Sequence, residues 1–72
     1  MRHGVSRQRR NQIGKLVRGH RERQAFSRTD LSILSGISPR AIAGIELGEN
    51  APTIGTLDAL AKALGVKARD LI

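Results

Sequence analysis

Side chains capable of covalent or acid–base chemistry are scarce in this sequence of 72 residues. It contains no cysteine, which excludes disulfides, thiolate metal sites and a cysteine nucleophile. His3 and His20 each stand alone, and Ser27 and Ser38 have no partnering His and Asp, so we interpret both serines as helix caps. We therefore predict no enzyme, no metal, no cofactor and no small-molecule ligand.

Basic side chains are the remaining candidates for function. Lys and Arg number 13 against 6 Asp and Glu, for a net charge of +7. Residues 1–40 carry a net charge of +8 and residues 41–72 one of −1. So uneven a distribution is typical of a face that binds a polyanion, most simply nucleic acid.

The apolar residues narrow the choice of polyanion. Phe26 is the one aromatic residue, whereas domains that bind single strands stack bases on several rings. No apolar run approaches the ~20 residues of a membrane span, and residues 1–11 offer only Met1 and Val5 to a bilayer surface. We predict no membrane association and, because disulfides are lacking, a cytoplasmic location.

Five short helices are predicted from apolar periodicity and from the Gly and Pro residues that separate the segments. Ile13, Leu16 and Val17, for example, share one helical face. The predicted helices cover about residues 7–24, 28–35, 39–47, 54–64 and 68–72. The stripe expected to face the core in the fourth is Ile54, Leu57, Leu60, Ala61 and Leu64. Since no stretch alternates like a strand, the predicted fold class is all-α, with one core.

The second and third predicted helices carry the clearest local pattern. Ser27 followed by Asp30 is the pattern of a capping box. Gly36 is placed to end the second helix, Ser38 to cap the third, and Pro39 to begin it. Two helices joined by a short turn containing glycine form a helix-turn-helix arrangement.

The stretch from Ile13-Gly14 to Leu64-Gly65-Val66 resembles the phage lambda repressor and Cro-like (XRE-type) helix-turn-helix family. Matching pieces between these ends include Arg21-Glu22, Phe26-Ser27, Leu31-Ser32, Gly36-Ile37-Ser38, Ile45-Glu46, Gly48 and Pro52-Thr53. The resemblance covers residues 13–72 and implies a compact five-helix DNA-binding domain with the helix-turn-helix at helices 2 and 3. It further implies a transcriptional regulator that works as a homodimer on a palindromic operator in double-stranded DNA. Residues 1–12 would precede the domain as a basic arm or a helix extension.

The resemblance also assigns roles to single residues. Arg21 and Glu46 match a structural ion pair between the first and third helices. The positions that face the major groove in the recognition helix, residues 39–47, are Pro39, Arg40, Ala43 and Gly44. Arg28 matches a residue that contacts a phosphate. The charge of the N-terminal segment, apart from the resemblance, adds further residues expected on the DNA backbone, and with the two caps these are Arg2, Arg7, Arg9, Arg10, Lys15, Arg18, Ser27 and Ser38.

Helix geometry gives a similar outward face for residues 39–47. If Ile42 and Ile45 point inward, then Arg40, Ala43, Gly44 and Leu47 point outward. Arg40 alone on this face has a hydrogen-bonding side chain, and arginine reads guanine O6 and N7 with about 1–3 kcal/mol of discrimination. We expect affinity to come mainly from the basic N-terminal segment and Arg28, and selectivity from Arg40 and DNA shape.

A protein-interaction module on the same fold is the alternative function. Its contact surface would use Ile33, Leu34, Leu47, Leu71 and Ile72. Leu71 and Ile72 have two open interpretations, since they either pack internally or pair with a second copy. The chain is either a regulator by itself or the DNA-binding part of a longer protein.

Overall fold

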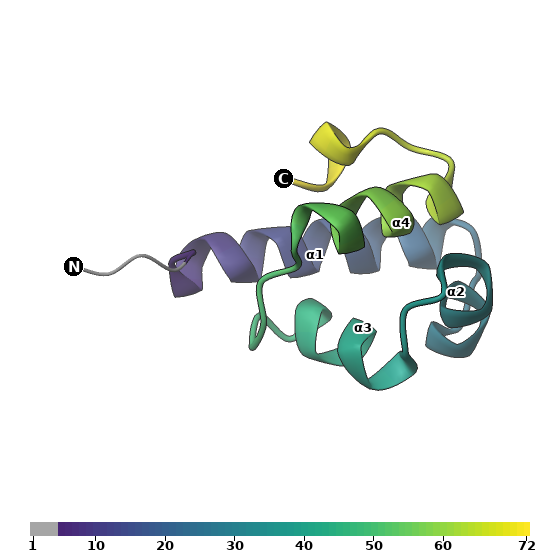
Figure 1. Cartoon of the computed structure of the whole chain (residues 1–72), viewed down its shortest axis with the longest axis horizontal. Helices are drawn as coiled ribbons and strands as arrows, with labels where there is room; N and C mark the ends of the chain where they lie inside the picture. The colour runs from purple at the N-terminus through teal and green to yellow at the C-terminus, as the bar shows by residue number, and fades with distance from the viewer. Residues whose placement is uncertain (1–4) are drawn as a thin grey trace.

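Four α-helices and a terminal 3-10 turn form the computed structural model, which describes residues 5–72 (Figure 1). The elements are α1 (Arg7–Arg23), α2 (Arg28–Ser35), α3 (Pro39–Glu46), α4 (Ile54–Leu64) and η1 (Ala68–Leu71). The described part of the chain contains no strand, which confirms the all-α prediction. The prediction of five helices is wrong, because the last segment closes through i→i+3 bonds between Lys67 and Asp70 as one 3-10 turn.

α1 runs along the length of the molecule and the other elements pack around it (Figure 1). α3 lies on one side of α1, and α4 with η1 lies toward the other. α2 closes the end of the molecule away from the N-terminus and contacts both α3 and α4. Across residues 5–72, no helix combines the length and the apolar character needed to traverse a bilayer.

Short-range hydrogen bonds determine where each α-helix begins. The Oγ of Ser6 accepts the backbone N–H of Arg9 at 3.1 Å, which starts α1. Ser27 and Asp30 form the predicted capping box, with reciprocal bonds of 2.9 and 2.8 Å. Each such cap satisfies an otherwise unpaired backbone N–H and contributes about 1 kcal/mol. α1 continues without a break from Arg7 through residues 12 and 13. The basic segment at its start and the buried residues Ile13 and Val17 therefore belong to one helix.

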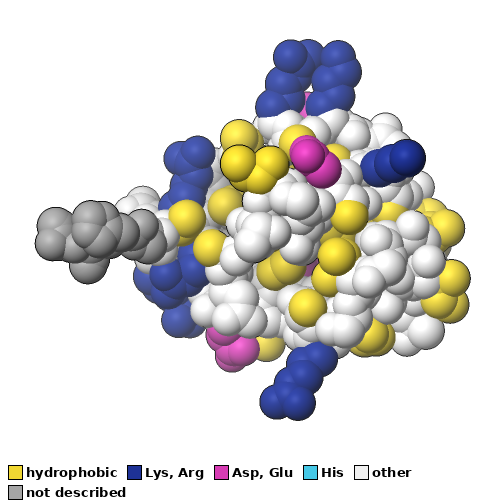
Figure 2. Space-filling model, viewed as in Figure 1, with side chains coloured by type: hydrophobic (Ala, Val, Ile, Leu, Met, Phe, Trp, Pro, Cys, Tyr) yellow, Lys and Arg dark blue, Asp and Glu magenta, His cyan; other side chains and the backbone are white. Residues whose placement is uncertain are grey.

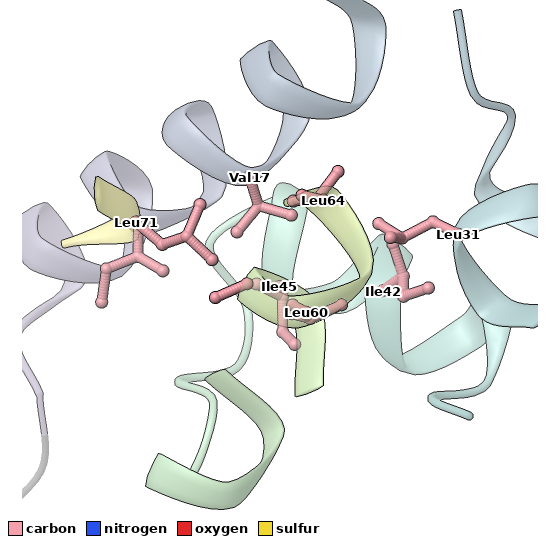
Figure 3. Packing of buried hydrophobic residues seen from close by; sticks show 9 residues of the cluster. Val17, Leu31, Ile42, Ile45, Leu60, Leu64 and Leu71 are labelled. Atoms are coloured by element: carbon pink, nitrogen blue, oxygen red, sulfur yellow. The ribbon is translucent and has the colours of Figure 1, made fainter. Parts of the chain in front are cut away.

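Nine buried apolar residues form one core that draws on every element (Figure 3). They are Ile13, Val17, Leu31, Ile42, Ile45, Leu60, Ala61, Leu64 and Leu71. Leu71 is fully buried, which favours internal packing over a dimer or partner contact for this residue; η1 folds back over α4 and α1 and inserts this side chain. Ile54, expected in the core, is 81% exposed, because it opens α4 before the part of the helix that is covered by other elements.

Gly14 sets the distance between α1 and α3. A Cβ added at Gly14 would overlap the carbonyl oxygen of Ile45 and lie 2.7 Å from that of Glu46. Both obstacles are backbone atoms of α3, so they cannot rotate away. The absence of a side chain therefore lets α3 approach α1 closely, beside the buried side chains of Ile13 and Val17.

Replacing Gly14 with alanine should separate α1 from α3 and destabilise the fold. We expect Gly14→Ala to lower the free energy of unfolding by about 1–3 kcal/mol, the usual cost of overpacking. Gly19→Ala is the matched control, because a Cβ at Gly19 meets no atom within 4 Å. This second substitution should stabilise the chain by about 0.5–1 kcal/mol through helix propensity. Urea denaturation followed by circular dichroism measures both; equal changes for the two variants would contradict this account.

Candidate nucleic-acid interface

The turn between α2 and α3 has the geometry required of a helix-turn-helix. Gly36 ends α2 in the left-handed region, at φ 76°, and its N–H donates to the carbonyl of Ser32 at 2.8 Å. The Oγ of Ser35 accepts the N–H of Ile37 at 3.1 Å, inside the turn. Ser38 then caps α3 by accepting the N–H of Ala41 at 3.1 Å. These bonds orient α3 relative to α2 without involving any residue distant in sequence.

The outer face of α3, defined here as Pro39, Arg40, Ala43 and Leu47, lies away from the core. Pro39, Arg40 and Leu47 are exposed and Ala43 is half-buried. Gly44 differs from the expectation that it points outward: it is buried, because the side chain of Asn50 lies over it. Arg40 is therefore the one exposed charged side chain that α3 presents.

Glu46 connects α1, α2 and α3 through a buried carboxylate. Its side chain is 1% exposed. Arg21, expected to pair with it, donates from Nε to Oε2 at 2.7 Å and from Nη2 to Oε1 at 3.0 Å. Arg28 adds a third bond, from Nε to Oε1 at 3.0 Å. The hydrogen bonds that Arg21 donates to Glu46 raise the pKa of Arg21 above its ordinary value, so this guanidinium remains charged.

Arg28 has a structural contact that was not foreseen for a residue expected on the DNA backbone. Only its Nε is used by Glu46, and its side chain is 39% exposed. Because one carboxylate meets two guanidinium groups, the cluster keeps an excess positive charge at the start of α2. The exposed part of Arg28 can therefore still attract a phosphate.

The basic residues of α1 fall into two groups. Arg7, Arg9 and Lys15 are exposed, and Figure 2 shows Lys and Arg side chains gathered where α1 begins. Arg10 instead donates from Nε to the carbonyl of Gly48 at 3.0 Å and from Nη1 to that of Val5. Arg18, though exposed, pairs with Glu22 at 3.0 Å. Arg2, also expected on the DNA backbone, lies outside the described residues.

The contact between Arg10 and Gly48 brings the start of α1 beside the end of α3. Arg40 lies at the other end of α3, in its first turn. Arg10 and Arg40 therefore place positive charge near the two ends of the outer face of α3, and the exposed Glu49, directly after Gly48, adds a negative charge near Arg10. The Oγ atoms of Ser27 and Ser38, which were expected on the DNA backbone, each accept a backbone N–H as helix caps, which leaves each O–H as a donor.

Two asparagine contacts were not predicted from the sequence. Asn11 lies against Gly48, where a Cβ would be 3.0 Å from Cγ of Asn11. Gly48 has a φ of 75°, so glycine is favoured there for conformation as well as for space. Asn50 covers Gly44 in the same way. A glycine marks one side of each contact, but nothing local in the sequence identifies its asparagine partner.

Comparison with known proteins agrees with this geometry. The sequence model described as Helix-turn-helix matches residues 17–71, so the chain belongs to the helix-turn-helix family, of the XRE type, whose members are DNA-binding transcription regulators. The chain is also similar to the crystal structure of the restriction-modification controller protein C.AhdI from Aeromonas hydrophila. That similarity has a TM-score of 0.84 at 27% identity, over 88% of this chain and 96% of the other. No curated protein sequence matches significantly.

Removing the buried carboxylate should cost far more than removing an exposed one. Glu46→Ala would leave Arg21 and Arg28 without their shared anion, and we expect the free energy of unfolding to fall by about 3–5 kcal/mol. Glu22→Ala is the control, since the side chains of Arg18 and Glu22 are 59% and 55% exposed. An exposed ion pair of this kind contributes less than about 1 kcal/mol. Chemical denaturation of the two variants side by side tests this. Similar losses would show that burial of the Glu46 cluster contributes little.

Proposed function

We propose that the chain is a sequence-specific transcriptional regulator that inserts α3 into the major groove of double-stranded DNA. The observation that carries this proposal is the exposed outer face of α3, with Arg40 in its first turn and basic side chains beside both ends. Arg40 would read guanine, while Arg7, Arg9, Lys15 and the exposed part of Arg28 would contact phosphates. Ala43 and Leu47 would contact only thymine methyl groups.

The proposal includes a homodimer on a two-fold operator. C.AhdI is a restriction-modification controller protein, and we extend to this chain a similar role in controlling transcription. Ile72 is 46% exposed and follows the buried Leu71, so it remains available for the contact between copies. A two-fold dimer of this kind demands half-sites separated by about one turn of DNA, roughly 34 Å.

Contact with a protein partner is a second candidate function. Ile33 is 77% exposed and Leu34 is 56% exposed, although both are large apolar residues on α2. Both were expected as a partner contact. In this alternative, α2 would bind another protein and α3 would read no sequence.

Selection of bound duplexes from a random library, followed by footprinting, tests the proposed function. We expect a site with two inverted half-sites whose centres are about 10 base pairs apart. Each half-site should contain a preferred G·C pair. Arg40→Ala should lower the difference in binding free energy between this pair and the other base pairs by about 1–3 kcal/mol. Arg40→Lys is the matched control, because it keeps the charge and loses the bidentate fork. Enrichment of no sequence, together with tight binding of a protein at Ile33 and Leu34, would favour the alternative.

The salt dependence of binding tests the role of the start of α1. Replacing Arg7 and Arg9 by alanine should weaken binding to all duplexes alike and reduce the slope of log K against log salt by about 2 per protomer. Lys62→Ala with Arg69→Ala removes the same charge from exposed residues of α4 and η1, which lie away from α3. This control should leave the slope nearly unchanged. An equal effect of both pairs would indicate that net charge alone attracts the DNA.

A further inference from the structure

The C-terminal end of α3 has no stabilising charge of its own. α3 contains eight residues, and a helix this short is marginal unless contacts with the rest of the chain hold it. Ser38 caps its first turn, but its last turn carries no basic side chain to balance the negative end of the helix dipole. A cation must therefore come from another element.

Arg10 supplies this cation from the start of α1. Its Nε donates to the carbonyl of Gly48 at 3.0 Å, and its Nη1 donates to the carbonyl of Val5, which directly precedes the cap of α1. Hydrogen bonds from a charged donor are about twice as strong as neutral ones. The side chain of Asn11 also lies against Gly48, which is buried. Two successive residues of α1 therefore hold the residue that directly follows Leu47.

Leu47 depends on this support more than the rest of the outer face of α3. It is the last residue of that face, at the C-cap of α3, and it is 55% exposed. Contact with a thymine methyl group requires close packing, since a gap of about 0.5–1 Å forfeits a quarter to a half of the attraction. Gly48 is bonded covalently to Leu47, so fixing one residue restricts the other.

We infer that Arg10 is a positioning residue for base recognition, which holds Leu47 against a thymine methyl group and does not itself contact a phosphate. The inference rests on the proposed insertion of α3 into the major groove. Arg10 precedes residues 17–71, which the family's sequence model matches, so this support lies outside the family pattern. Arg7, one turn earlier, is exposed, and its side chain makes no hydrogen bond among residues 5–72. The two arginines should therefore behave differently.

Hydrogen exchange on the free chain tests the contact itself. Arg10→Ala should speed exchange about 10-fold or more, the value of one hydrogen bond to a charged group, at three backbone N–H groups that donate to carbonyls of α3. These N–H groups belong to Gly48, Glu49 and Asn50. Arg7→Ala removes the same charge from the neighbouring turn and should leave the three rates unchanged. Equal rates in the wild type and in Arg10→Ala would contradict the inference, whatever the chain binds.

Replacing thymine by uracil in the selected duplex tests the consequence for base reading. For the full wild-type chain, one such replacement in each half-site should weaken binding about fourfold, the value of one buried methyl group. Arg10→Ala and Leu47→Ala should each abolish this difference, and the double variant should lose no more than either. The preference for the G·C pair read by Arg40 should be retained in Arg10→Ala.

The salt dependence of binding separates positioning from a phosphate contact. Arg7→Ala should reduce the slope of log K against log salt by about 0.9 per protomer, and Arg10→Ala should reduce it by less than half of that. Arg10→Lys keeps the charge but lacks the planar fork that reaches two carbonyls. This variant should keep the slope and lose the preference for thymine over uracil.

The outcomes distinguish this inference from the proposed function. Equal weakening of all duplexes by Arg10→Ala, with the slope reduced as in Arg7→Ala, would overturn the positioning role and leave the proposed function standing. Full retention of the thymine preference in Arg10→Lys would overturn it too, because charge alone would then suffice. A wild-type chain without any sequence preference would defeat the insertion of α3 and, with it, this inference. Loss of the thymine preference alone, together with faster exchange after α3, supports both.

Discussion

The buried carboxylate of Glu46 is the interaction on which the arrangement of the helices depends. A charge with 1% of its side chain exposed would be prohibitive in isolation, and it is accepted here because three N–H donors reach its two oxygens. The donors come from α1 and α2, while the acceptor belongs to α3. One carboxylate therefore fixes the end of α3 against both neighbouring helices, through directional bonds that apolar packing alone would not supply. The same bonds explain why Arg28, at the start of α2, is held close to α3.

Close backbone approach completes what the ion cluster begins. Gly14 lets the last turn of α3 rest against α1, and Asn11 and Arg10 then contact Gly48 just beyond that turn. α3 is consequently held at its inner side and at its end, while its outer face carries no structural bond. A recognition surface needs this separation, because base reading requires side chains fixed in place by a shell that they do not themselves form. The cost is a narrow tolerance for substitution along the line where α1 meets α3.

Local features were predictable from the sequence and distant contacts were not. The capping box of Ser27 and Asp30, the cap at Ser38 and the left-handed Gly36 all depend on residues within four positions of one another, so spacing alone reveals them. Leu71 and Asn50 show what residue spacing does not reveal. Burial of Leu71 depends on η1 folding back over α4 and α1, and the position of Asn50 depends on two hydrogen bonds to the carbonyl of Gly44. Apolar periodicity reports a face, but it does not report which part of that face another element covers, as the exposed Ile54 demonstrates.

The pairing of the arginines alters what the basic composition implies for DNA recognition. A net charge of +7 suggests many phosphate contacts, yet Arg10, Arg18 and Arg21 are hydrogen-bonded within the chain. Arg28 also donates its Nε to Glu46, and only the rest of its guanidinium is free for a phosphate. Among residues 5–40 the exposed Lys and Arg side chains that make no hydrogen bond within the chain are Arg7 and Arg9 at the start of α1, Lys15 in its middle, and Arg40. Under the proposed function, fewer phosphate contacts mean a weaker sequence-independent term, so a larger share of the affinity must come from base contacts. With Pro39, Ala43 and Leu47 on the outer face, α3 supplies little of that share beyond Arg40.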